Sequence, residues 1–335
     1  VTGDELMTTR ARANVLREKL TRDPHGITSA EVDEVLSSCL ACKGCRTECP
    51  SNVDMTRLRS EILQLRHDSL PLHRRLSAVC FRSFMVSRMA FVERCGAIIP
   101  HIYNFFASNS VTSRLIKRLL RFSTQCSIPM LSHHTMRYLI RHDSCENAET
   151  HRKVYLFCDE FTSYPGAKLG LRFARLLRTL GYEVILPRHV ESGRAAISKG
   201  HLHYAARLAR RNTKLLAPLI SENAPLIGIE PSCILSFRDE YPRLVENYPS
   251  SLADNALLFD EFLCREIDAG RIDLSFRPSA LSPLRLSADI WLHGHCHQKA
   301  LVGIEKTARL LQYVTTGKVH VIPASCCGMA GSFGY

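Results

Sequence analysis

The sequence has no long apolar run. Its longest stretch without a charged residue, from Cys95 to Ser113, is broken by Pro100, Asn104 and Asn109, so we expect no membrane-spanning helix. The first residues lack the charged-then-apolar pattern of a signal peptide. With 45% hydrophobic and 23% charged residues, the composition excludes a disordered, collagen-like or coiled-coil chain, and 335 residues suggest about two domains.

Acidic residues are nearly absent from the middle of the chain. Residues 69–142 include eleven basic residues and one acid, Glu93, so this segment carries +10 of the net charge of +12. Leu115, Ile116, Leu119 and Leu120 lie among these basic residues at helical spacing, which predicts a basic amphipathic helix.

Three interpretations of this helix are open. Its apolar side packs inward and its basic side is solvated, or the segment docks on an acidic partner or an anionic membrane surface. The third, nucleic-acid binding, is the least favoured because no stacking platform of aromatic and basic residues accompanies the charge. We therefore expect no nucleic-acid partner.

Fourteen cysteines are spread over the whole chain, whereas a small disulfide scaffold packs its cysteines into fewer than about 100 residues. We expect a reducing, cytoplasmic location with thiols available for metal. Solitary cysteines on apolar or helical stretches are expected to be buried and inert: Cys80, Cys95, Cys126, Cys145 and Cys264.

One cysteine run is specific. Cys39, Cys42, Cys45 and Cys49 form C-x2-C-x2-C-x3-C-P, the spacing of a ferredoxin-type [4Fe-4S] site. A structural zinc site usually has two pairs separated by a dozen or more residues. The chain contains no second copy of the run, so Cys49 either closes this cluster or serves one whose other ligands lie elsewhere.

Helices are expected on both sides of this run. Val32, Val35 and Leu36 form the apolar stripe of a short helix before Cys39, and a second helix begins after Pro50. A cluster loop between two helices is typical of small ferredoxin-type modules within helical domains.

From about Lys153, strands alternate with helices, which predicts a mostly parallel sheet. The predicted strands are residues 154–157, 184–186, 226–229, 290–292 and 319–322, with helices at 169–180 and 201–219. Cysteines or their replacements follow the strands: Cys158, Glu191-Ser192-Gly193, Cys233, Cys296 and Cys326-Cys327-Gly328. Because ligands gather at the carboxyl ends of parallel strands, we expect Cys233, Cys296, Cys326 and Cys327 to bind a metal or cluster. The histidines around Cys296 are either zinc ligands or groups that tune a cluster.

These motifs resemble a known family. The second half is similar to the cysteine-rich CCG domain of heterodisulfide reductase, of the glycerol-3-phosphate dehydrogenase C subunit and of the glycolate oxidase iron–sulfur subunit. The whole chain resembles the C-terminal iron–sulfur half of FAD-linked dehydrogenases of D-2-hydroxyacids such as D-lactate, glycolate or 2-hydroxyglutarate. Thr9 to Asn14, Cys39 to Cys45 and Pro50 to Met55 carry that resemblance. In the first CCG repeat, the cysteine pair is replaced by Glu191-Ser192, and Glu230 replaces the first cysteine of its C-x-x-C.

The resemblance implies an α+β protein in three parts: a helical ferredoxin-like [4Fe-4S] module at 1–68, a basic helical connector at 69–150 and a CCG-type α/β domain at 151–335. It implies that FAD lies in a further domain, in the same longer chain or a separate subunit, and that a second iron–sulfur cluster is possible at the CCG site. Electrons would pass from the flavin to a quinone or redox protein, with possible peripheral contact at the inner face of the membrane. The alternative is a thiol/disulfide reductase like heterodisulfide reductase, or, less favoured, a zinc-stabilised interaction module.

Overall fold

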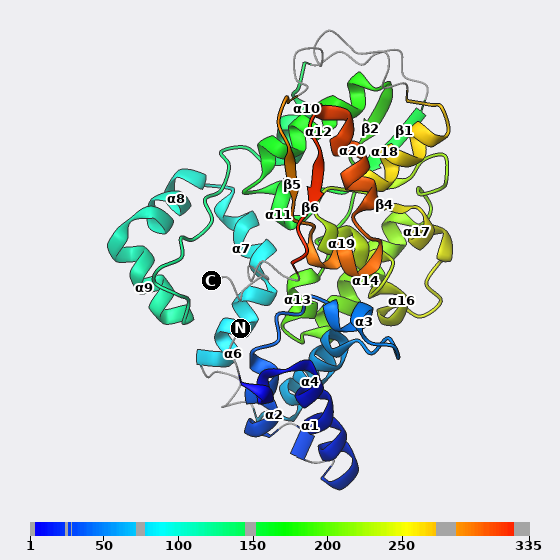
Figure 1. Ribbon diagram of the computed structural model, residues 1–335. Coiled ribbons are helices and arrows are strands. Elements are labelled where there is room, and N and C mark those ends of the chain that lie inside the picture. The colour runs from blue at the N-terminus through cyan, green and yellow to red at the C-terminus, as the bar shows by residue number, and fades with distance from the viewer. Residues whose placement is uncertain are drawn as a thin grey trace. The chain divides into compact units, whose positions relative to one another are not determined.

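The computed structural model describes residues 4–23, 26–27, 29–71, 78–144, 152–272 and 286–324 (Figure 1). They fall into two compact units. Within the described ranges, the first unit contains residues 4–130 and Gly193–Arg207, and the second contains residues 131–192 and 208–324. The described part of the first unit is helical, and the second combines helices with short parallel strands, which confirms the expected α+β class.

The first unit begins with helices around one small apolar core. These are η1 (Glu5–Met7), α1 (Thr9–Arg22), α2 (Ala30–Ser37), α3 (Gly44–Glu48) and α4 (Met55–Ser69). The buried residues that pack together are Leu16, Ile27, Val32, Leu36 and Met55. The cysteine loop therefore lies between two packed helices, α2 and α4, as predicted.

More helices follow in the first unit. These are α6 (Ala78–Ser87), α7 (Met89–Gly96), α8 (Pro100–Ser108), α9 (Ser110–Leu120), α13 (Arg194–Ser198) and the start of α14 (Leu202–Leu216). Asn109 separates α8 from α9 and caps α9, because its Oδ1 accepts hydrogen bonds from the N–H groups of Val111 and Thr112.

Helix α9 is the predicted basic helix, but it packs only in part as the first interpretation expects. Its buried residues are Ser113 and Lys117, whereas Leu115 and Leu119 are exposed. Ile116 and Leu120 are half-buried, so part of the apolar side packs inward as the first interpretation expects, whereas the part that carries Leu115 and Leu119 does not. Helices α6 and α8 contact α9, and they leave the side that carries Leu115 and Leu119 uncovered.

The second unit is built on a parallel sheet with strand order β2-β1-β3-β4. Its strands are β1 (Arg152–Leu156), β2 (Tyr182–Ile185), β3 (Leu226–Gly228) and β4 (Ala256–Leu258). Its helices in chain order are α10 (Met136–Arg141), α11 (Glu160–Ser163), α12 (Ala167–Thr179), the end of α14, α15 (Pro231–Ile234), η3 (Leu235–Phe237), α16 (Tyr241–Leu244), α17 (Ser250–Asp254), α18 (Phe259–Asp268), α19 (Cys296–Leu301) and α20 (Glu305–Val314).

Both faces of this sheet are covered, because alternate residues of a strand point to opposite sides. Leu156 and Ile227 pack with Phe173 of α12 and Phe262 of α18. On the other face, neighbouring strand residues pack with the end of α14, with α15 and with η3. Such burial on both sides is typical of parallel sheets and explains the short apolar runs.

The prediction that all strands form one sheet is wrong. Strands β5 (Ile290–Leu292) and β6 (Val319–Val321) pair only with each other among the described residues, as a separate two-stranded parallel sheet. Strand β4, which the sequence analysis missed, lies at the edge of the four-stranded sheet instead. Residues Leu226 to Gly228 of β3 pair with Ala256 to Leu258, so that edge of β3 is already occupied.

The five predicted strands all exist, within one or two residues of their expected bounds. Among the solitary cysteines, Cys264 is buried as expected, whereas Cys95 is exposed and Cys126 is half-buried, which corrects their expected burial. Cys145 and the side chain of Cys80 lie outside the described residues. In the part of the chain that the structure describes, no helix is long and apolar enough to cross a membrane.

Candidate functional site

The four clustered cysteines line one loop and one short helix. Cys39 follows the end of α2, Cys42 precedes α3, Cys45 lies in α3, and Cys49 is the residue at which α3 ends. All four are half-buried and none is in a disulfide. Thiols at the edge of the first unit are therefore accessible to a cofactor while their backbone is fixed by helices.

The backbone of this loop is tightly turned. Ala41, Lys43 and Asn52 have φ angles of 54°, 61° and 55°, in the left-handed region that non-glycine residues seldom adopt. A left-handed residue between right-handed ones turns successive N–H groups toward a common point, which is a backbone arrangement that favours anions. The chain also passes close to its own sulfur: a Cβ added to Gly44 would lie 3.6 Å from Cys42 Sγ.

Cys45 is influenced by its burial and by neighbouring charged groups. Burial is the largest cause that raises the pKa of Cys45, and Asp54, Cys39 and Cys42 add to it through their negative charges. A polynuclear cluster requires several thiolates close to one another, because its iron ions neutralise their charges together.

Cys49 has a different environment. The backbone N–H groups of Val53 and Ser51, with that of Asn52, hydrogen-bond its sulfur and lower its pKa. Hydrogen bonds from backbone amides to sulfur are among the means by which proteins set the potential of iron–sulfur clusters.

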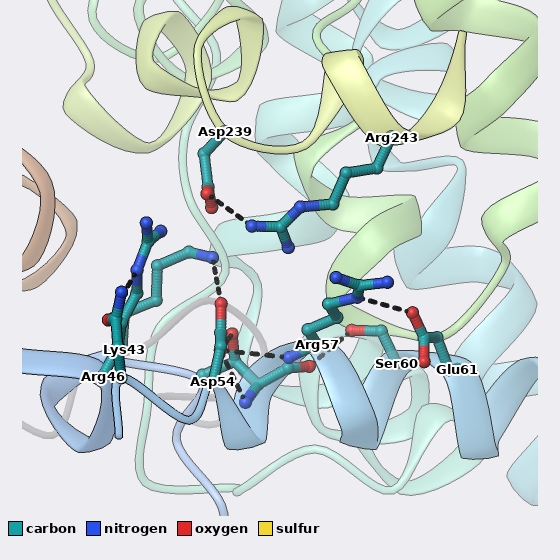
Figure 2. Close-up of polar contacts among 10 residues, drawn as sticks. Lys43, Arg46, Asp54, Arg57, Ser60, Glu61, Asp239 and Arg243 are labelled. Carbon is teal, nitrogen blue, oxygen red and sulfur yellow. Dashed lines mark hydrogen bonds and ion pairs between the residues drawn. The ribbon is translucent and has the colours of Figure 1, made fainter. Parts of the chain in front are cut away.

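A buried ion pair fixes the loop against α4. Lys43 Nζ lies 3.2 Å from Asp54 Oδ2, and both side chains are almost fully buried (Figure 2). Asp54 also begins α4, because its Oδ1 accepts hydrogen bonds from the N–H groups of Thr56 and Arg57. Burial raises the pKa of Asp54, but the charge of Lys43 and the bonds from Thr56 and Arg57 outweigh it, so the pKa lies below its usual range.

Two arginines hold the end of α2 from which Cys39 emerges. Arg12 Nε donates to Val35 O at 3.1 Å, and Arg59 Nε donates to Leu36 O at 3.3 Å. These carbonyls belong to the last turn of the helix, where cations are favourable. Arg59 also donates through Nη1 to Ser198 O at 2.8 Å, which ties α4 to α13 within the first unit.

The strand ends of the second unit carry a hydrogen-bonded network. Ser192 Oγ donates to Glu160 Oε1 at 2.6 Å, and Ser192 N donates to Oε2 of the same carboxylate at 3.0 Å. Ser192 Oγ also lies 3.3 Å from Cys233 Sγ. Burial raises the pKa of Cys233 well above its usual value, and the charges of Glu160, Asp159 and Glu230 add to this.

The topology thus brings together two of the positions that the sequence analysis aligned with the first CCG repeat. Ser192 stands where a cysteine is expected, and it contacts the fully buried Cys233. Cys158 follows β1 and is buried, and burial raises its pKa to about 11. These surroundings keep both thiols protonated in the chain as it stands, because burial and nearby carboxylates oppose a thiolate.

Cys296 is the first residue of α19 and is half-buried. His295 precedes it and caps the helix by accepting a hydrogen bond from His297 N, and its Nε2 lies 3.5 Å from Glu230 Oε1. Cys326 and Cys327 lie outside the described residues.

Within the described ranges, no group of three or more His, Cys, Asp or Glu side chains already stands in metal-binding geometry. The donor set at Cys39, Cys42, Cys45 and Cys49 nevertheless fits an iron–sulfur cluster. It consists of half-buried thiols alone on a short turned loop, and cysteine thiolates are the ligands that iron–sulfur clusters take.

The sequence analysis missed two groups at these sites. The first is the pair Lys43 and Asp54. The available sequence signal for it was the position of Asp54 directly before a helical pattern, where an aspartate is favoured as a helix cap. Glu160 gave no signal, since its partner Ser192 is distant in sequence and only the parallel sheet brings them together.

Sequence comparison finds relatives of known activity. The D-2-hydroxyglutarate dehydrogenase of Escherichia coli (strain K12) is 29% identical over 319 residues, which are 92% of this chain. That of Pantoea ananatis (strain AJ13355) is 30% identical over 323 residues, also 92% of this chain. The chain spans only 29% of the length of either protein.

A second kind of relative is shorter. The C subunit of the anaerobic glycerol-3-phosphate dehydrogenase of Escherichia coli (strain K12) is 25% identical over 256 residues, which cover 76% of this chain and 63% of that relative. No family model matches the chain. No solved structure matches it either. The comparisons confirm the expected resemblance: the chain is a homologue of part of the D-2-hydroxyglutarate dehydrogenases, and also of the anaerobic glycerol-3-phosphate dehydrogenase C subunit.

Proposed function

We propose that this chain is the iron–sulfur electron-transfer part of an FAD-linked dehydrogenase that oxidises a D-2-hydroxyacid. The observation that carries the proposal is the loop of four half-buried thiols, Cys39, Cys42, Cys45 and Cys49, between two packed helices. A [4Fe-4S] cluster held there would supply a one-electron carrier, which a two-electron flavin needs in order to pass electrons singly to an acceptor.

The residues around the thiols have positioning roles in this proposal. The pair Lys43–Asp54 holds the loop on α4, and Arg12 and Arg59 hold the end of α2. Backbone amides at Ser51 and Val53 direct hydrogen bonds to the sulfur of Cys49. Cations and amide dipoles near the thiolates stabilise added negative charge, so these groups favour the reduced cluster.

The substrate and the flavin are inferred from the relatives. D-2-hydroxyglutarate dehydrogenases align with almost the whole chain, yet the chain spans 29% of their length. We therefore place the hydroxyacid site and FAD in a further domain, in the same longer chain or a separate subunit, and a quinone or redox protein as acceptor. The protein is proposed to be cytoplasmic, since a reducing compartment keeps dispersed thiols free.

We further propose the domain division that the sequence predicts: a ferredoxin-type module at 1–68, a connector at 69–150 and a CCG-type domain at 151–335. A second cluster is proposed on the side of Cys296, Cys326 and Cys327. The network of Glu160, Ser192 and Cys233 supports one such site rather than two, because it fills the first half with hydrogen-bonded side chains.

The test separates substrate oxidation from electron exit. In the full-length dehydrogenase, Cys42→Ser and Cys45→Ser should abolish turnover with an external dye acceptor while anaerobic bleaching of the flavin by the hydroxyacid proceeds. Cys95→Ser, at an exposed cysteine outside the run, is the matched control and should retain both activities. Dye turnover that survives both cluster substitutions would overturn the relay. Reduction of a disulfide substrate at the CCG site would favour a reductase instead.

A further inference from the structure

Helix α9 presents an apolar stripe to solvent. Val111, Leu115 and Leu119 recur every fourth residue and are 73%, 68% and 65% exposed. The residues that α9 buries are Ser113 and Lys117. A helix whose contacts lay only within its own unit would bury the leucines and expose the lysine. The exposed apolar side of α9 therefore suits contact with another molecule.

The preceding helix continues the same feature. In and just before α8, which contacts α9, the exposed large apolar side chains are Ile98, Ile99, Ile102, Phe105 and Phe106. Among the described residues of α8, only Ala107 is buried. Helices α8 and α9 are neighbours (Figure 1). The eight large apolar side chains on them and just before α8 make a surface that water disfavours and that a partner would cover.

The charge on this surface has one sign. Arg114 and Arg118 are exposed on α9 and lie beside the stripe, since they follow Val111 and Leu115 by three residues. Arg94 and Arg121 are exposed nearby, and the single acid of the segment, Glu93, is buried. An occupant with an apolar interior and an anionic rim matches this pattern.

An anionic bilayer has this composition. Apolar side chains of an in-plane helix enter the boundary between headgroups and acyl chains, while arginines contact anionic headgroups. The two helices are short, with nine and eleven residues, and no described helix can cross a membrane, so an in-plane geometry is the one available. A second copy of the chain fits less well, because it would bring the same arginines against each other.

We infer that the α8–α9 surface, defined by the eight apolar residues above with Arg114 and Arg118, binds the headgroup region of an anionic bilayer. The inference gives a surface to the peripheral membrane contact that the resemblance implies, and it rests on the proposed function only for its use. An electron carrier held at a bilayer meets membrane-dissolved acceptors. Binding itself needs no cluster and no turnover.

The experiment is flotation of the full chain, purified anaerobically, with phosphatidylcholine vesicles that contain about one-third phosphatidylglycerol. Wild type should float with them, and should float much less with pure phosphatidylcholine or in high salt. Leu115→Ser/Leu119→Ser should weaken binding roughly tenfold or more, because both side chains lose their burial in the bilayer. Arg114→Glu/Arg118→Glu should abolish the preference for phosphatidylglycerol.

The matched control is Leu169→Ser/Leu219→Ser, which removes two exposed leucines elsewhere and should bind like wild type. Circular dichroism shows whether each variant is folded. Equal flotation of the Leu115/Leu119 variant and the control overturns the inference. So does an absence of vesicle binding together with concentration-dependent dimerisation that the Leu115/Leu119 variant loses, since the occupant is then a protein. Iron content, measured on the same samples, reports on the proposed function independently.

Discussion

Lys43 Nζ lies 3.2 Å from Asp54 Oδ2, and the two side chains are only 2% and 8% exposed. A buried ion pair gives little net stability compared with apolar residues, but breaking it leaves an uncompensated buried charge. The pair joins the turned cysteine loop to the first turn of α4. It is therefore the contact through which the loop geometry depends on the helical core.

Asp54→Asn should lower the free energy of unfolding by about 3 kcal/mol, because it removes the carboxylate charge from the buried ion pair with Lys43 while the asparagine still caps α4. Chemical denaturation measures this. Glu61→Gln is the control: its pair with Arg57 is about half exposed, and its loss should cost no more than about 0.5 kcal/mol. Similar small losses in both variants would show that the buried pair does not fix the loop. The double variant Lys43→Met/Asp54→Asn should recover part of the loss.

The stability of the chain should fall as the pH drops from 6.5 toward 4. Burial lowers the pKa of His201 to about 4, and the charges of His67 and Arg88 add to this. The folded pKa lies below the unfolded value of 6.5, so the unfolded chain binds more protons in this window and acid favours it. His201→Phe keeps a ring stacked on His67 and should flatten the decline in melting temperature with pH. His203→Gln, at an exposed histidine, is the control and should leave the decline unchanged. An unchanged pH profile in His201→Phe would refute this account.

Thiol accessibility should report cluster binding directly. In anaerobically purified protein, Cys39, Cys42, Cys45 and Cys49 should resist alkylation, and all four should become reactive after oxidative removal of the cluster. Exposed Cys95 should react in both states, and buried Cys264 in neither. Mass spectrometry of the alkylated peptides measures this. Protection of Cys95 together with the four would indicate a global change in accessibility rather than ligation.

Ser192→Ala should destabilise the second unit by about 1–3 kcal/mol, because the fully buried Glu160 loses its hydroxyl donor. The control is Ser37→Ala, at an exposed serine whose Oγ donates to Glu34 O, with an expected change within about 0.5 kcal/mol. Iron content should be unaffected by either change. A loss of iron in Ser192→Ala alone would instead place Ser192 beside a cluster.

Local pattern was enough for much of the fold. The apolar stripe of α2 at Val32, Val35 and Leu36 and the short strands β1 to β3 were predictable, because burial imposes their periodicity on the sequence. Strand β4 was not, since Ala256 to Leu258 run directly into α18 with no turn residue between them. The cysteine spacing predicted the candidate cluster loop for the same local reason.

Other features depend on contacts between distant residues. A lysine inside a cysteine motif suggests a solvated charge, whereas the folded chain buries Lys43 beside Asp54. The contact of Ser192 with Glu160 needs the parallel pairing of β1 with β2. The exposure of Leu115 depends on how α6 and α8 approach α9, which helical periodicity alone does not specify.

The central claim is that Cys39, Cys42, Cys45 and Cys49 hold an electron-carrying [4Fe-4S] cluster. The most direct measurement is iron and acid-labile sulfide content with EPR of the dithionite-reduced protein, for wild type, Cys42→Ser, Cys45→Ser and Cys95→Ser. The account predicts a reduced-cubane signal in wild type and in Cys95→Ser. Both cluster variants should lose this signal and about four iron atoms per chain. Zinc without sulfide, or a cubane signal that survives both Cys42→Ser and Cys45→Ser, would contradict it.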